Sequence, residues 1–533
     1  MRTSHLLASL PLLLAPVVVA GCADPDGASA NDDELTSVEG VEHTIDFDGF
    51  VDVTPGASDD AVKAAIHREL KSSLGALRER GVGVADRDGQ RNLAAAELAR
   101  QTLDVVDGAG AVVGAVERIR FHYHDVALVD RDRLPGGPID LTLLYGDYVA
   151  RAGELIAICS DDPGAEADSL WYHFSPGRTS CKNAIRGEQS AIDADQEHLA
   201  IAGQISVRDR DRRFLATRAT LTRSVAAPDR YPEYDQLWGF AGDPARTKLV
   251  VYAFTGVDAD EADPHDNGLV EFLRQQRTLR GKLPGLQVVE TSPQAWLLDF
   301  WIDGQKLTGV TWDDVERWVI DGTGWPAAVG SDAGKRAALL GQVVANFSER
   351  WIVWQRPVLV TRDGATRAMT LEIRTFYGWE DGSPEARLHA RWRYLEAFWH
   401  ADVFSYTGHS HFGHGPLEPW TYSGDNFPSR YQVMLVNSCL SFNYYDEDFL
   451  AMHPGGSAQL DVVVNGLAAY WRGMGQASGS YIASLVDGGD HSWRDVLTSM
   501  RVDLPWQAAY DPMRAVNGEL DNTYTPTAPI ELR

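Results

Sequence analysis

Two stretches, Val403-Phe-Ser-Tyr-Thr-Gly-His409-Ser-His-Phe-Gly-His414-Gly415 and Val433-Met-Leu-Val-Asn-Ser438-Cys439, decide the fold. Each begins as an apolar run of the kind that forms a buried parallel strand, and each ends in a reactive side chain. Open α/β sheets build their active sites at the carboxyl ends of such strands. The sequence separation of 30 residues from His409 to Cys439 leaves room for a loop and one crossover. The pattern therefore predicts a histidine and a cysteine on neighbouring strands, at one edge of a sheet.

These two side chains form a candidate catalytic pair. Cysteine is an effective nucleophile only as the thiolate, and an imidazole held beside it favours that form. The same imidazole can then protonate a leaving group. We expect Cys439 to act as the nucleophile and His409 as the acid and base.

The two blocks resemble those of the caspase–gingipain clan of cysteine peptidases. Tyr406-Thr-Gly-His409 is most similar to the gingipain side of that clan, and Ser438-Cys439 matches its nucleophile block. The resemblance implies a caspase-like domain over roughly residues 245–500 and a cysteine endopeptidase that cleaves peptide or protein substrates without a cofactor. It also implies an oxyanion hole made by the N–H groups of Ser410 and Cys439. The clan places glycine where this chain has Ser410. The Cβ of the serine narrows the approach of a substrate to the oxyanion hole.

The second half of the chain alternates strand-like and helical segments. Expected strands are 248–254, 295–302, 351–354, 358–360, 368–377, 403–407, 433–437 and 460–464, and expected helices are 267–280, 312–320, 334–347, 383–400 and 478–486. Alternation of this kind predicts an α/β domain over residues 247–533, with a mostly parallel sheet flanked by helices.

A smaller α+β domain is expected over residues 44–225, joined by a linker at 226–246 that is rich in proline and glycine. Its expected elements are a strand at 44–53, a helix at 61–79 opened by Ser58, and β-rich segments at 112–129, 139–150 and 198–223. His122 and His124 alternate along a strand and could share a face as metal ligands. Because the sequence offers no third metal ligand beside them, the two histidines are more typical of surface residues than of a metal site.

The N-terminus resembles the signal of a bacterial lipoprotein. Leu6 to Val19 is apolar but short for a membrane span, and Val19-Ala-Gly-Cys22 resembles a lipobox. The resemblance implies a signal peptide at 1–21, lipid on Cys22, and a flexible tether at 22–43. Because Ala23 follows the cysteine, it also implies anchoring in the cell envelope, at the outer membrane. The alternative is an ordinary secretory signal that happens to contain a cysteine.

The remaining cysteines agree with an exported protein. Cys159 and Cys181 are near enough in sequence to form a disulfide in an oxidising compartment, which leaves Cys439 as the free thiol. The net charge of −28, from 48 basic and 76 acidic residues, argues against nucleic acid as a partner and against attraction to anionic lipid.

Two other functions remain open. His409-x-His411-x-x-His414 resembles the first ligand block of the metallo-β-lactamase fold, which would make the protein a zinc hydrolase. Gly413 stands where that family has aspartate. The other alternative is a non-catalytic surface lipoprotein on the same fold.

Overall fold

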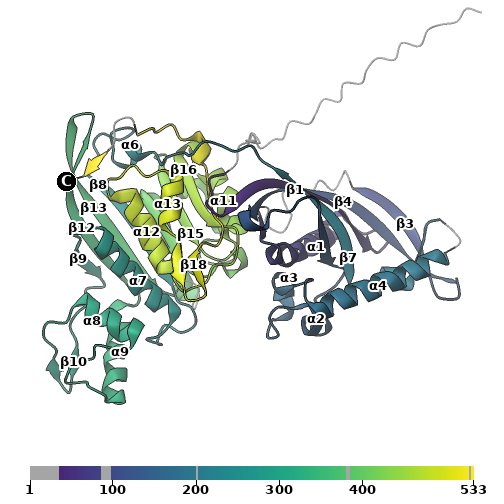
Figure 1. Ribbon diagram of the computed structural model, residues 1–533, viewed down its shortest axis with the longest axis horizontal. Helices are drawn as coiled ribbons and strands as arrows, with labels where there is room; N and C mark the ends of the chain where they lie inside the picture. The colour runs from purple at the N-terminus through teal and green to yellow at the C-terminus, as the bar shows by residue number, and fades with distance from the viewer. Residues whose placement is uncertain (1–34, 86–97, 200–201, 380–383, 527–529, 533) are drawn as a thin grey trace, which may run out of the picture. The chain divides into compact units, whose positions relative to one another are not determined.

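The second half of the chain forms a nine-stranded sheet. The structure is a computed structural model that describes residues 35–85, 98–199, 202–379, 384–526 and 530–532. The strand order is β19-β16-β15-β14-β8-β13-β12-β20, and β9 also pairs with β12 (Figure 1). The strands are β8 (Lys248–Gly256), β9 (Gln287–Ser292), β12 (Arg350–Arg362), β13 (Ala365–Gly378), β14 (Val403–Thr407), β15 (Gln432–Asn437), β16 (Leu460–Asn465), β19 (Arg514–Asn517) and β20 (Glu531–Leu532).

The sheet is mixed, so the prediction of a mostly parallel sheet is wrong. Only the central strands β13, β8, β14, β15 and β16 run parallel. β12 pairs antiparallel with β13, β20 and β9, and β16 pairs antiparallel with β19. The reason lies at Asp363 and Gly364, whose positive φ angles of 52° and 76° make a tight hairpin turn. A connection this short can join only antiparallel strands, and it makes β12 and β13 one long hairpin.

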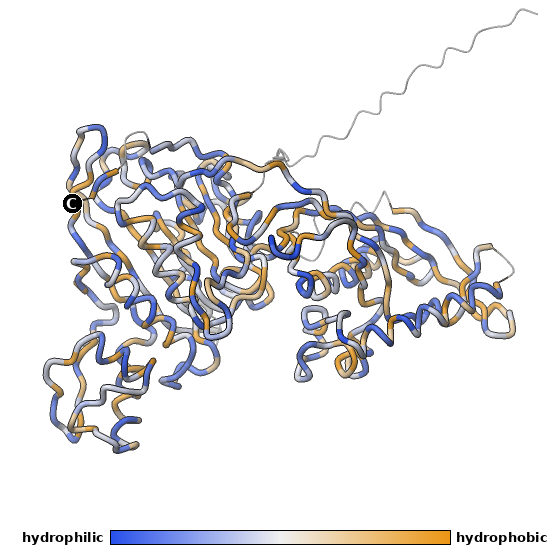
Figure 2. The backbone as a smooth tube through the Cα atoms, in the orientation of Figure 1, coloured by the Kyte–Doolittle hydropathy of each residue, from blue (hydrophilic) through white to orange (hydrophobic). Residues whose placement is uncertain are grey.

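Helices cover both faces of this sheet. Along β8, Val251 and Ala253 belong to one hydrophobic core and Tyr252 and Phe254 to the other, as the alternation of a strand requires. The first face packs against α7 (Asn267–Lys282), α12 (Met474–Val486) and α13 (Trp493–Ser499), and the second against α10 (Pro384–His400) and α11 (Ser441–Met452). Figure 2 shows hydrophobic stretches gathered along these central strands.

Of two helices between the strands, one matches the expectation and one differs in part. α9 (Ala333–Phe347) matches the expected helix, while α8 (Trp312–Glu316) continues into a π-helical turn at Arg317–Asp321. The strand expected at 295–302 is wrong for most of its length, because only β10 (Trp301–Ile302) pairs there, with β11 (Gln305–Lys306). The expected linker contains α6 (Tyr234–Leu237).

A second sheet is formed by the first half of the chain, in the order β5-β7-β1-β4-β3-β6, with β2 paired to β4. Every pairing is antiparallel except that of β3 with β6. The strands are β1 (Gly40–Val53), β2 (Val82–Val84), β3 (Ala99–Val106), β4 (Val112–Asp130), β5 (Ile139–Leu144), β6 (Gln204–Ser206) and β7 (Phe214–Arg223). Helix α1 (Asp59–Glu79) packs on it, and its N-cap Ser58 accepts a hydrogen bond from the Ala61 N–H, as the sequence predicted.

The disulfide between Cys159 and Cys181 is confirmed. It joins the end of α2 (Ala152–Cys159) to the first turn of α4 (Thr179–Glu197), and the short helix α3 (Leu170–His173) lies in the loop between them. We call residues 159–181 the disulfide loop. Within the described residues, no helix combines the length and the apolar character that crossing a membrane requires. Cys22 lies outside the described residues.

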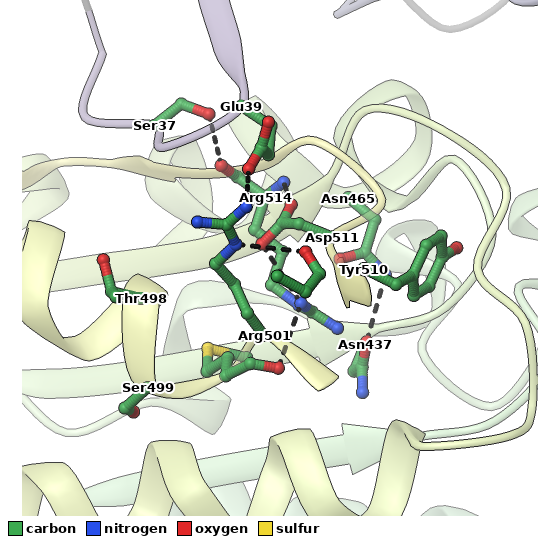
Figure 3. A network of polar contacts seen from close by, with 12 residues as sticks. Ser37, Glu39, Asn437, Asn465, Thr498, Ser499, Arg501, Tyr510, Asp511 and Arg514 are labelled. Atoms are coloured by element: carbon green, nitrogen blue, oxygen red, sulfur yellow. Dashed lines mark hydrogen bonds and ion pairs between the residues drawn. The ribbon is translucent and has the colours of Figure 1, made fainter. Parts of the chain in front are cut away.

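The segment before β1 is bound to the far end of the chain. Ser37 donates to the carbonyl of Arg514, and Glu39 pairs with Arg501 at 2.5 Å (Figure 3). Arg514 is itself buried and paired with Asp511 at 3.2 Å. These contacts, together with a hydrophobic core that is continuous between the two sheets, join the described residues of both halves into one compact unit.

Candidate active site

Three neighbouring parallel strands converge on the candidate site. Thr255 of β8, Thr407 of β14 and Asn437 of β15 lie side by side in register. Beyond this row, at the same edge of the sheet, the chain reaches Asp258, His409 and Cys439 within two or three residues. The expected placement of the histidine and cysteine strands as parallel neighbours is confirmed.

His409 is held by a carboxylate that the sequence analysis did not identify. Its Nε2 lies 3.1 Å from Oδ1 of Asp258 and 3.2 Å from the Asp258 carbonyl oxygen. The other carboxylate oxygen accepts a hydrogen bond of 2.7 Å from Asn267 Nδ2. Asp266, the N-cap of α7, accepts from the backbone N–H groups of residues 258, 259 and 260. The loop after β8 is thus fixed so that Asp258 faces the imidazole.

The three histidines of the 409–414 block have different neighbours. The His409 side chain is 41% exposed, and its ring packs edge-on against Trp471 at 5.2 Å and His411 at 5.6 Å. His414 binds Glu418 through Nδ1 at 3.0 Å. In the described part of the chain, no group of three or more His, Cys, Asp or Glu side chains is arranged to hold a metal ion.

Cys439 stands at the junction of β15 and α11. Directly after it, Leu440 adopts the left-handed conformation (φ 50°, ψ 33°), which is strained for a residue with a branched side chain. His411 and Phe412, just after His409, also have positive φ angles of 48° and 54°. Strained backbone of this kind concentrates at functional sites, and here it flanks both candidate catalytic residues.

Buried polar side chains brace the nucleophile turn. Asn465 donates to Oδ1 of Asn437 at 3.2 Å (Figure 3). It also donates to the Ser438 carbonyl at 2.9 Å. Ser441 donates to the Val436 carbonyl and accepts from the Asn465 N–H, both at 2.7 Å. Because the side chains of Asn437, Ser441 and Asn465 are fully buried, each lost hydrogen bond would leave an unsatisfied group.

The Cys439 sulfur is held as a thiol in this conformation. It donates to the Ala469 carbonyl at 3.5 Å, and across the described residues it forms no hydrogen bond with either nitrogen of His409. Burial raises the pKa of Cys439, while the nearby positive charge of Arg78 acts in the opposite direction. The structure brings the two strands together but does not bring the two reactive atoms into contact.

The backbone around Ser410 is also fixed. Its carbonyl accepts hydrogen bonds from the Tyr445 hydroxyl at 2.7 Å and from the Gly413 N–H at 2.8 Å. Within the described chain, the N–H groups of Ser410 and Cys439 donate no hydrogen bond to another residue.

His122 and His124 share a face of β4, and two carboxylates oppose them on β1. His122 lies 3.0 Å from Asp48, and His124 lies 2.7 Å from Asp46. The hydrogen bond with Asp48 raises the pKa of His122. The sequence could not reveal these partners, because they are more than 70 residues away.

A scan against models of protein families, a search of curated proteins and a search of solved structures each returned no match.

Proposed function

We propose that the protein is an exported, lipid-anchored cysteine endopeptidase that acts on peptide bonds by Cys-His acyl transfer. The observation that carries the proposal is the meeting of Asp258, His409 and Cys439 at one edge of three adjacent parallel strands. A histidine oriented by a carboxylate on one strand and a cysteine on the next are the parts that such chemistry needs. The parallel order β13-β8-β14-β15-β16 also agrees with a caspase-like sheet.

The mechanism assigns one task to each residue. The Cys439 thiolate attacks the scissile carbonyl, and a C–S bond forms while the oxygen becomes an oxyanion. The N–H groups of Ser410 and Cys439 stabilise that oxyanion. His409, oriented by Asp258, carries the thiol proton to the leaving amine, and the C–N bond breaks. It then removes a proton from water, which hydrolyses the thioester and restores the thiol.

Catalysis on this mechanism requires a rearrangement. The thiol must release the Ala469 carbonyl and come within reach of His409, since hydrogen-bond distance is needed for proton transfer. Two features favour the thiolate once it forms: the N-terminus of α11, which begins two residues after Cys439, and the Arg78 charge. The structure therefore corresponds to a resting form of the proposed enzyme.

Thiol alkylation tests the proposal together with a peptidase assay. Because burial raises the pKa of Cys439 in this resting form, we expect iodoacetamide to label it more slowly than a denatured-chain thiol, and the proposed mechanism predicts that His409→Ala slows the labelling further at mildly acidic pH. Hydrolysis of fluorescently labelled denatured protein should disappear in Cys439→Ala. Equal and slow labelling of both proteins, with no hydrolysis, would favour the non-catalytic lipoprotein.

The zinc hydrolase alternative has less support, because His409 and His414 are engaged by different carboxylates. It makes a separate prediction: a chelator would abolish hydrolysis, and alkylation of Cys439 would not.

A further inference from the structure

The disulfide loop contacts the loop that follows His409. Phe412, which is 38% exposed, packs edge-on against Trp171 at 5.2 Å and against Tyr172 at 5.6 Å. Trp171 is buried in the core, whereas Tyr172 lies at the boundary with solvent. Two aromatic rings from the first half of the chain thus lie against the candidate active-site loop.

The position of Tyr172 is fixed from several sides. The Arg78 guanidinium stacks on its ring at 4.5 Å and forms an ion pair with Asp161, which also binds His173 at 3.0 Å. The disulfide closes the loop at its base, where the Ser175 N–H donates to the Cys159 carbonyl at 2.8 Å. Such bracing limits the freedom of the loop to move away by itself.

Tyr172 and Arg78 are also neighbours of the nucleophile. Burial and the nearby Cys439 sulfur raise the pKa of the Tyr172 hydroxyl, and the Arg78 charge acts on Cys439 itself. Close by, Asn443 of α11 donates to the Val84 carbonyl at 3.2 Å. A Cβ added to Gly83 would lie only 2.2 Å from the Gly466 carbonyl oxygen, so the backbones there are in direct contact. The first half of the chain therefore adjoins both the histidine loop and the nucleophile helix.

We propose that the disulfide loop is a built-in cover, which holds Tyr172 over the approach to Cys439 and must move before a peptide can reach the sulfur. The inference rests on the proposed function, because it assigns a regulatory role to a contact with that same site. An extended peptide that binds at this edge of the sheet needs space beside the loop that follows His409, and there the Tyr172 ring lies 5.6 Å from Phe412 with the Arg78 guanidinium stacked on it at 4.5 Å. The device is an autoinhibitory contact within one chain.

The test measures the rate of iodoacetamide labelling of Cys439 in the full mature chain. Tyr172→Ala removes the ring contact with Phe412, and we expect labelling to become faster by on the order of tenfold. Tyr172→Phe keeps the ring and should label at the native rate. Asp168→Ala, an exposed change in the same loop, is a second control. Cys439→Ser gives the background, and thermal melting shows which variants fold.

A second variant approaches the contact from its other side. Phe412→Ala should accelerate labelling about as much as Tyr172→Ala, and the double variant should add little, because both changes break one contact. This variant keeps the cover testable if Tyr172→Ala fails to fold. Native labelling rates in both folded variants would overturn the proposal, as would slower labelling.

The outcomes separate the cover from the peptidase function. Faster labelling without peptide hydrolysis in any variant would support the cover and refute the enzyme. Hydrolysis that depends on Cys439, with unchanged labelling and unchanged rates in Tyr172→Ala and Phe412→Ala, would support the enzyme and refute the cover. Faster labelling accompanied by faster hydrolysis is the result that we expect.

Discussion

Replacing Asp258 by asparagine tests the carboxylate that the structure adds to the candidate site. The Nε2 of His409 lies 3.1 Å from Oδ1 of Asp258, which is the geometry of a charge-assisted hydrogen bond when the ring is protonated. Such a bond contributes about 1.5–3 kcal/mol, or roughly 10- to 150-fold in rate if it forms fully only during the reaction. Because the His409 side chain is 41% exposed and that of Asp258 is 24% exposed, solvent screens the pair.

We therefore expect Asp258→Asn to lower kcat/KM by about 10- to 50-fold, at the lower end of that range. The loss should appear in kcat with KM nearly unchanged, since the carboxylate orients His409 and does not contact substrate. The assay is steady-state hydrolysis of fluorescently labelled peptides. Asp260→Asn, in the same loop but exposed and away from the imidazole, is the matched control.

Two results would refute this reasoning. Asp258→Asn could leave kcat at the native value in a protein that Cys439→Ala inactivates, which would make the hydrogen bond irrelevant to catalysis. Alternatively, Asp260→Asn could cause the same loss, which would point to a general effect of the loop charge. Thermal melting of both variants excludes a loss through unfolding.

Three further predictions concern the anchor, the nucleophile turn and acid stability. Cys22→Ser should release the protein from the membrane fraction without changing its melting temperature, and recovery in membranes at the native level would contradict lipidation. Asn465→Ala should destabilise the protein by about 1–3 kcal/mol in denaturant melts, because it leaves the Ser438 carbonyl and Oδ1 of Asn437 without this donor. Burial lowers the pKa of His453 to about 4, so the unfolded chain binds its proton more tightly and stability falls as pH drops from about 6.5 toward 4. Between pH 7 and 4.5 the free energy of unfolding of His453→Gln should fall by about 2–3 kcal/mol less than that of the native protein. An equal fall in both proteins would show that His453 is not the group responsible.

Much of the fold follows from local patterns in the sequence. The apolar runs at 248–254, 403–407, 433–437 and 460–464 are all strands, because a strand buried on both faces needs a continuous apolar segment. Helix α1 was predicted with its cap, since Ser58 and the acidic residues after it satisfy the first turn locally. Helix α4 was missed, because most of its surface is exposed and few apolar residues mark its period.

The candidate site could be predicted only where its residues follow an obvious strand. His409 and Cys439 were found because each ends an apolar run. Asp258 follows β8 in the same way, but it lies 151 residues from His409 and within an acidic loop, so sequence alone did not distinguish it from solvated carboxylates. The contact of Tyr172 with Phe412 joins segments 240 residues apart, and neither carries a recognisable motif.

The resting state and the proposed cover have one physical cause. A thiol becomes a nucleophile when the balance between burial and nearby positive charge favours the thiolate. Here burial prevails, although Arg78 and the N-terminus of α11 both oppose it. Tyr172 packs against Phe412 beside this site, and the Arg78 guanidinium stacks on its ring. On the proposed cover, moving the ring would admit water to the sulfur while the Arg78 charge remains, so the same displacement that opens the approach would also lower the pKa of Cys439.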